Sequence, residues 1–197
     1  MKHLTIIALI FITRLSYGQN YKALNEYQNN IIIPAGKAMF YGNFVQRLGL
    51  SSGDFPQEIR LINDDTMEIF TFNVKPTFKT AKENTFSYII SPGNYTILHY
   101  WWIQSKWYGA KFFTEPIYKG NGSKEILADK LRFEELNESD LDKYEFTITA
   151  NSLNYLGTWH FDTEIVSFTD DKVNFDNKIK DKFKSLDLLK ALTVLPD

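Results

Sequence analysis

The chain has 197 residues, 44% hydrophobic and 23% charged, which suits one folded domain and excludes a globally disordered chain. Its 22 basic and 24 acidic residues leave no basic excess to neutralise phosphates, which argues against nucleic acid as a partner. The absence of cysteine excludes disulfides, thiolate metal ligands and a cysteine nucleophile.

The first 18 residues are predicted to be a secretory signal peptide. Lys2 provides a positive start, residues 4–12 form a short apolar run, and Ser16 and Gly18 are the small residues that a signal peptidase requires. The run is too short to span a bilayer as a helix, and no later segment is apolar enough to do so. We therefore predict cleavage after Gly18 and a soluble, secreted or periplasmic protein without a transmembrane segment.

Residues 19–34 are polar at first and are predicted to be an N-terminal linker. From there to residue 168, alternation of apolar and polar residues with a period of two predicts a series of strands. The predicted strands are 37–45, 58–62, 66–75, 85–91, 95–104, 106–118, 144–150 and 153–161, and residues 164–168 extend the last of them. Turn residues separate them, including "NDD" at 63–65, "PGN" at 92–94 and a tight connection at Gln104–Ser105.

Two segments lack the strand pattern. Residues 119–143 are charged and glycine-containing, with helical spacing around residues 126–133, and are predicted to be an insertion between strands. Residues 169–197 carry apolar side chains at helical spacing, with Asp170 or Asp171 as an N-cap. This pattern predicts a C-terminal amphipathic helix.

Two segments of the chain resemble each other, "AGKAMFYGNF" (35–44) and "ANSLNYLGTW" (150–159). Alanine, an aromatic residue and glycine recur in them at matching offsets. Glycine inside a strand marks a bulge or a close approach of two backbones. We interpret the two segments as equivalent strands of a pseudo-symmetric sandwich.

Seven or eight short strands without intervening helices predict a mainly β fold, an antiparallel β-sandwich of residues 35–168. The motif "SPGNYTI" (91–97), preceded by "FSYII" and followed by "FTITANSLNYLG" (146–157), resembles a class of uncharacterised bacterial exported proteins. The resemblance implies a transthyretin-like or immunoglobulin-like sandwich. Because that class has no assigned activity, it implies no site residues.

Residues that carry chemistry are few. Only His99 and His160 remain after signal removal, and no nucleophile elbow, phosphate loop or calcium loop occurs. His160 and Asp162 would share one face of a strand, either as a hydrogen-bonded pair or, as we favour, as two solvated polar groups. His99 is predicted to be a hydrogen-bonded core or edge histidine. We therefore predict a protein that is not an enzyme and has no cofactor and no metal site.

The segment "NYTILHYWWIQSKWYG" (94–109) contains three of the four tryptophans. On a regular strand it places apolar residues on both faces, Tyr95 to Ile103 at odd positions and Leu98 to Trp102 at even positions. One face must meet the core. The other is either covered by the insertion and the C-terminal helix, which we favour, or exposed as a docking surface. The candidate binding residues are Tyr100, Trp102, Trp107 and Tyr108.

These features predict an exported, non-enzymatic binding or accessory module of the cell envelope, with an unknown protein or glycan as partner. The alternative is a carbohydrate-binding or carbohydrate-active protein that uses the aromatic strand 95–108 as a platform. This alternative requires a concave aromatic row with carboxylates nearby. A third hypothesis is a structural subunit that pairs with another chain through a sheet edge or the aromatic face.

Overall fold

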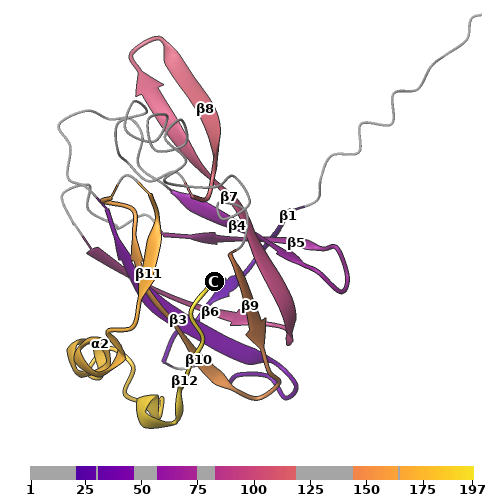
Figure 1. The fold of residues 1–197 in the computed structure, drawn as a ribbon, viewed down its shortest axis with the longest axis vertical. Coiled ribbons are helices and arrows are strands. Elements are labelled where there is room, and N and C mark those ends of the chain that lie inside the picture. Colours follow the sequence, from indigo (N-terminus) through magenta and orange to yellow (C-terminus); the bar gives the residue numbers. More distant parts are fainter. Residues whose placement is uncertain (1–20, 30, 47–56, 75–82, 119–143, 164) are drawn as a thin grey trace, which may run out of the picture.

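The computed structural model describes residues 21–29, 31–46, 57–74, 83–118, 144–163 and 165–197 (Figure 1). The predicted signal peptide and the predicted insertion at 119–143 lie outside the described residues. Within these ranges the protein is mainly β, with two mixed sheets and one α-helix.

The first sheet, called sheet A, is built around the long strand β7. In spatial order it contains β1 (Tyr21–Ala23), β5 (Ile69–Asn73), β4 (Glu58–Asn63), β7 (Gly93–Lys106) and β8 (Gly109–Pro116), with β9 (Glu145–Ile148) also paired to β7. β4 and β5 form the hairpin that "NDD" predicts. The Asn63 side chain holds its turn by accepting hydrogen bonds from the backbone N–H groups of Asp65 and Thr66.

The second sheet, called sheet B, has β3 at its centre. In spatial order it contains β11 (Ser167–Thr169), β10 (Leu153–His160), β3 (Ala38–Val45), β6 (Glu83–Ile90) and β2 (Asn25–Glu26), with β12 (Leu192–Thr193) also paired to β10. Every residue of β3 is buried. A strand that is buried on both faces must have other elements packed against each face, and β3 is packed on both.

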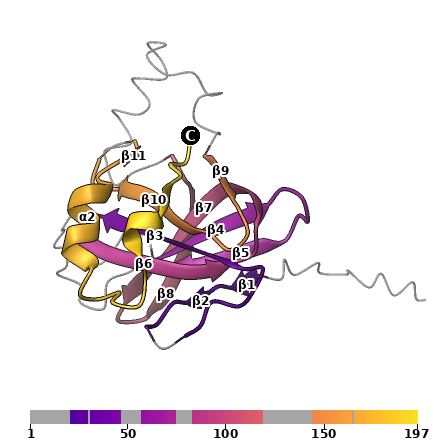
Figure 2. The same ribbon diagram turned by 90° about the horizontal axis from the view of Figure 1, so that it is seen from below.

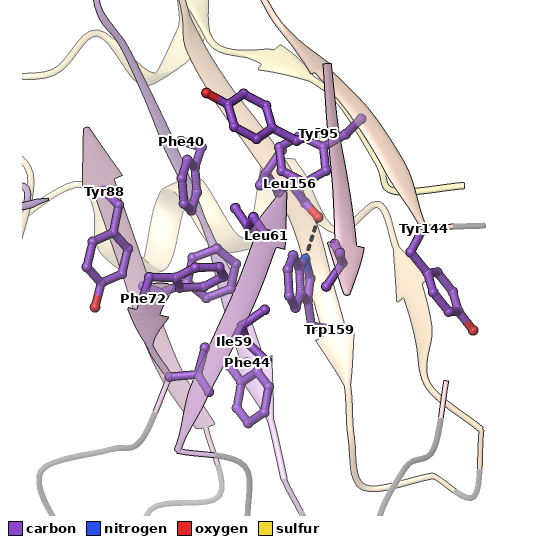
Figure 3. Close-up of a cluster of buried hydrophobic side chains, with 14 of the residues drawn as sticks. Phe40, Phe44, Ile59, Leu61, Phe72, Tyr88, Tyr95, Tyr144, Leu156 and Trp159 are labelled. Carbon is purple, nitrogen blue, oxygen red and sulfur yellow. Dashed lines mark hydrogen bonds between the residues drawn. The ribbon is translucent and has the colours of Figure 1, made fainter. Parts of the chain in front are cut away.

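The inner faces of the two sheets share one aromatic core (Figure 3). Phe40 of β3 lies 5.3 Å from Phe72 of β5, measured between ring centroids. The fully buried Trp159 of β10 contacts Phe72 and Phe86 edge-on, at 5.9 Å and 5.2 Å. Edge-to-face packing of this kind is the geometry that aromatic quadrupoles favour. The high aromatic content is therefore used mainly to join the sheets.

The two similar segments, 35–44 and 150–159, lie side by side in sheet B, where β3 and β10 pair in parallel. Their register slips between Tyr155 and Thr158, where β10 contains a bulge. Gly157 lies in the bulge with a left-handed φ of 88°, a conformation that side chains disfavour. The predicted bulge is confirmed, but the two strands are neighbours in one sheet.

Gly42 of β3 lies against this bulge. A Cβ atom at Gly42 would be 2.7 Å from the carbonyl oxygen of Gly157 and would also meet the ring of Phe86. Beside it, the indole N–H of Trp159 donates a 2.8 Å hydrogen bond to the carbonyl oxygen of Leu156, drawn dashed in Figure 3. The glycines permit the close approach, and the indole satisfies a buried carbonyl that the bulge frees.

The prediction of a purely antiparallel sandwich is wrong. β1 with β5, β3 with β10, and β10 with β12 are parallel pairs. The "PGN" turn also differs from the predicted hairpin, because β6 and β7 on either side of it belong to different sheets. Parallel neighbours arise when the chain leaves one sheet and returns to it through another element, a connection that residue alternation does not reveal.

The segment predicted as a linker contributes β1 and β2, one to each sheet. The N–H of Leu24 donates to Thr71 in sheet A, and the N–H of Tyr27 donates to Ser87 in sheet B. This segment therefore bridges one edge of the two sheets (Figure 2). Its polar side chains are compatible with strands because most of them are exposed.

The C-terminal region is more irregular than the single predicted helix. The helix α2 spans only Lys172–Ile179 and is followed by a short 3₁₀ helix at Leu188–Lys190 and by β12. Figure 2 shows α2 beside sheet B. Phe175 and Ile179 of the helix pack with Met39 and Tyr41 on the outer face of this sheet. Among the described residues, no helix is long and apolar enough to cross a membrane.

A Gly42→Ala substitution tests the glycine contact. Since the added methyl group meets backbone, we expect a loss of about 1–3 kcal/mol in the free energy of unfolding, measured by urea denaturation. Gly36→Ala is the matched control, because its Cβ has open space but its φ is 79°. It should lose about 1–2 kcal/mol through backbone strain alone. A Gly42→Ala protein as stable as the wild type would contradict the close contact.

Candidate functional site: the aromatic hairpin

β7 changes the direction of its side chains halfway along its length. Tyr95 and Ile97 are buried at odd positions, whereas Tyr100 and Trp102 are buried at even positions. The register of β7 against β4 slips at this point, because Arg60 pairs with His99 and Leu61 pairs with Ile97. The extra residue, Leu98, is the bulge that exchanges the two faces. Both predicted faces of the aromatic strand therefore supply the core.

Tyr100 and Trp102, two of the four predicted binding residues, are core residues. Tyr100 is 3% exposed and packs edge-on against Phe161, and Trp102 is 5% exposed and stacks on Phe113 at 4.2 Å. Side chains buried in this way join the β7–β8 hairpin to the body of the protein. They cannot form an exposed platform.

Trp107 and Tyr108, the other two predicted binding residues, lie at the tip of the hairpin between β7 and β8. The turn is three residues later than predicted, and Gly109 follows it with a φ of 146°. The side chains of Trp107 and Tyr108 are 96% and 64% exposed. In Figure 1 the hairpin projects from one end of the molecule. We call this tip, with the exposed Phe112 of β8, the aromatic tip.

An aromatic and polar surface continues from the aromatic tip along the outer face of sheet A. Trp101 contacts Phe112, with their ring centroids 5.9 Å apart. Further along, the Arg60 guanidinium lies 4.0 Å from the centre of the Tyr21 ring, a cation–π contact. Phe112 and Arg60 could not be found from alternation alone, because alternation does not show which partner strands flank β7.

His99 is held by Arg60 on this outer face. The Arg60 guanidinium donates a 2.9 Å hydrogen bond to Nε2 of His99, which must therefore be the unprotonated nitrogen. Burial and the neighbouring positive charge of Arg60 both lower the pKa of His99 below its usual 6.5. His99 is thus a neutral, hydrogen-bonded histidine near neutral pH. The interpretation as a hydrogen-bonded residue is confirmed.

The prediction that the C-terminal helix covers the aromatic strand is wrong. α2 packs on the outer face of sheet B, where Phe175 contacts the rings of Tyr41 and Tyr155. The Tyr41 hydroxyl also donates a 2.7 Å hydrogen bond to Asp176 of the helix. The helix does need an apolar partner, but β3 and β10 provide it on the outer face of sheet B.

The His160–Asp162 pair is present on sheet B. Nδ1 of His160 lies 3.6 Å from Oδ1 of Asp162, and Nε2 of His160 lies 2.9 Å from the hydroxyl oxygen of Thr169. The order carboxylate, imidazole, hydroxyl resembles a nucleophilic relay. The 3.6 Å separation is longer than a hydrogen bond, however, so this geometry does not orient the imidazole as a base.

Among the described residues, no group of three or more histidine, aspartate or glutamate side chains could hold a metal ion. Comparisons with models of protein families, with curated proteins and with solved structures find no match to this chain.

Substitution of individual tryptophans tests the placement of the aromatic strand. Trp107→Ala should change the free energy of unfolding by about 0.5 kcal/mol or less and should remove much of the fluorescence that acrylamide quenches. Trp102→Ala opens a core cavity and should cost about 3–5 kcal/mol. Urea denaturation and acrylamide quenching of the two variants measure these effects. Equal stability losses in both would contradict the assignment of one tryptophan to the tip and one to the core.

Replacement of Arg60 tests the coupling to His99. In Arg60→Met the pKa of His99 should rise toward 6.5, since the repulsion by the guanidinium is removed. In the wild type, His99 of the unfolded chain binds a proton more readily than His99 of the folded chain. The free energy of unfolding should therefore decrease as the pH falls below about 6.5. NMR titration of the His99 ring measures this pKa. The control Lys22→Gln removes a charge from the neighbouring β1 and should leave the pKa unchanged, and an unchanged pKa in Arg60→Met would refute the coupling.

Proposed function

We propose that the protein is an exported, non-enzymatic binding module of the cell envelope that docks onto a protein partner through the aromatic tip. The observation that carries this proposal is the exposure of Trp107, Tyr108 and Phe112 on a projecting hairpin. Exposed aromatic clusters are costly in water and are enriched at the centres of protein interfaces. The buried stacking of Trp102 on Phe113 supports the hairpin from below, so the tip can be presented rigidly.

A protein partner fits the geometry of the tip better than a glycan does. The rings of Trp107 and Tyr108 are nearly perpendicular, with an interplanar angle of 88°. Such a pair offers no common flat surface for consecutive sugar rings, and the tip is convex where the carbohydrate hypothesis requires a concave row. A convex pair of anchor side chains instead fits a recess in a protein surface.

The proposed export rests on the pattern of the first 18 residues, and the proposed module on two sheets that share a core. Membership of the transthyretin-like or immunoglobulin-like sandwiches stays a prediction. The parallel pairing of β3 with β10 is a feature that any such relative would need to share.

Site-specific photo-crosslinking in the native host tests the docking proposal. Benzoylphenylalanine at position 107 should give one discrete protein adduct, and Tyr108→Ala in the same chain should reduce its yield. The matched control places the crosslinker at Leu189, which is 93% exposed in the C-terminal region, away from the hairpin. The crosslinked chain should begin at Gln19.

Three outcomes would overturn the proposal. Equal adducts from positions 107 and 189 would mean that the tip has no special role. Glycan-array binding that Trp107→Ala abolishes, without a protein adduct, would support the carbohydrate alternative. A chain that retains Met1 would contradict export.

A further inference from the structure

Positive charge is concentrated in the C-terminal region of the protein. Residues 172–190 contain six lysines, three aspartates and no other charged side chain, so their formal net charge is +3. The whole chain is acidic by contrast, with a formal net charge of −2 at pH 7. Charge separated in this way creates a local positive potential that attracts negatively charged partners.

Two lysines of this region, Lys180 and Lys184, remain available to a partner. Both are exposed and line a groove of about 330 Å³ that the end of α2 forms with the 3₁₀ helix. The two aspartates that line the same groove, Asp176 and Asp187, each pair with a lysine outside its lining. Asp181 is not among the lining residues. Lys180 and Lys184 form no ion pair with any residue that the structure describes, so their charges are not compensated there.

Leu189 lines the same groove as these two lysines and projects into water. Its side chain is 93% exposed, whereas the preceding Leu188 is 7% exposed and packs in one cluster with Phe183. The carbonyl oxygen of Leu188 also accepts a 2.8 Å hydrogen bond from Nζ of Lys172 of α2. These contacts fix the backbone of the 3₁₀ helix, so Leu189 is held in its exposed position.

We call Lys180, Lys184 and Leu189 the basic patch, and their chemistry fits an anionic lipid surface better than an acidic protein. Arginine and aromatic side chains predominate at protein interfaces, where lysine is depleted. Residues 172–190 contain no arginine, and their two phenylalanines are buried. At a membrane, lysine side chains extend toward the headgroup phosphates while a neighbouring leucine enters the apolar layer. The basic patch contains both parts of such a contact.

The basic patch and the aromatic tip lie at opposite ends of the molecule. In Figure 1, α2 and the 3₁₀ helix that follows it lie at the bottom, whereas the β7–β8 hairpin projects at the top. A protein that rests on a lipid surface through the basic patch therefore directs the aromatic tip away from that surface.

We propose that the basic patch docks the protein onto a membrane surface that contains anionic phospholipids. The ammonium groups of Lys180 and Lys184 contact the lipid phosphates, and Leu189 inserts between the headgroups. The lysines provide attraction to the charged surface, and the leucine adds burial of apolar area. The proposal does not depend on the docking of a protein to the aromatic tip, because the opposite end of the molecule carries it.

Co-sedimentation with lipid vesicles tests the proposal. The chain from Gln19 to Asp197 is used, because it contains every residue that the structure describes and lacks the apolar run of the predicted signal peptide. Vesicles of equal parts phosphatidylcholine and phosphatidylglycerol should bind this chain. Vesicles of phosphatidylcholine alone should bind it at least about tenfold more weakly, because they lack net negative charge. Added salt should weaken the binding, since it screens the attraction.

Substitutions of exposed residues locate the contact. Lys180→Gln and Lys184→Gln should each weaken vesicle binding about fivefold, whereas Lys111→Gln, the same charge change on β8, should leave it unchanged. Leu189→Ala should weaken binding about five- to tenfold. Its control is Met67→Ala, which truncates an exposed apolar side chain in the β4–β5 turn and should bind as the wild type does. All five side chains are exposed, so the variants should fold normally.

Trp107→Ala should bind vesicles as the wild type does, which separates this result from the docking proposal. Loss of vesicle binding in Trp107→Ala, with unchanged binding in the lysine variants, would overturn the proposal and place the lipid contact at the aromatic tip. Equal binding to both kinds of vesicle, or equal losses in Lys111→Gln and Lys184→Gln, would also contradict it. A protein adduct from a crosslinker at position 189, without vesicle binding, would assign the basic patch to a protein partner instead.

Discussion

The parallel contact between β3 and β10 is the constraint on which the rest of the structure depends. Gly42 allows β10 to approach, and Gly157 lets β10 bulge against it. Without the bulge, the side chains that follow Tyr155 would exchange faces, because the side-chain period of a strand is two. The bulge keeps Tyr155 under α2 and directs Trp159 into the shared core. Core and helix docking thus depend on one pair of glycines.

A second bulge, in β7, has a comparable effect in sheet A. The extra residue, Leu98, lets β7 bury the odd-numbered Tyr95 before the bulge and the even-numbered Trp102 after it. In both sheets the bulged strand has two successive partners along one edge, β9 and β8 for β7, and β12 and β11 for β10. A bulge therefore marks where each long strand changes its neighbours, and it lets one strand serve two packing environments.

The aromatic tip differs in chemistry and in position from the cleft that Asn43, His160 and α2 line on sheet B. The aromatic tip is apolar and belongs to sheet A, whereas the described residues that line the cleft are mostly polar or charged and belong to sheet B and α2. An apolar projection gains most from burial in a partner.

The sequence by itself determined the β-rich fold, most strand positions, the turn at 63–65 and the glycine-marked bulge, because alternation, turn propensity and glycine are local properties. It also singled out Trp107 and Tyr108, which the structure exposes. Only the tertiary structure decided that Tyr100 and Trp102 are core, that α2 covers β3 and that Asn43 joins His160 in a cleft. Each of these depends on strand order or on a bulge, and a single residue's shift in register moves a side chain to the opposite face.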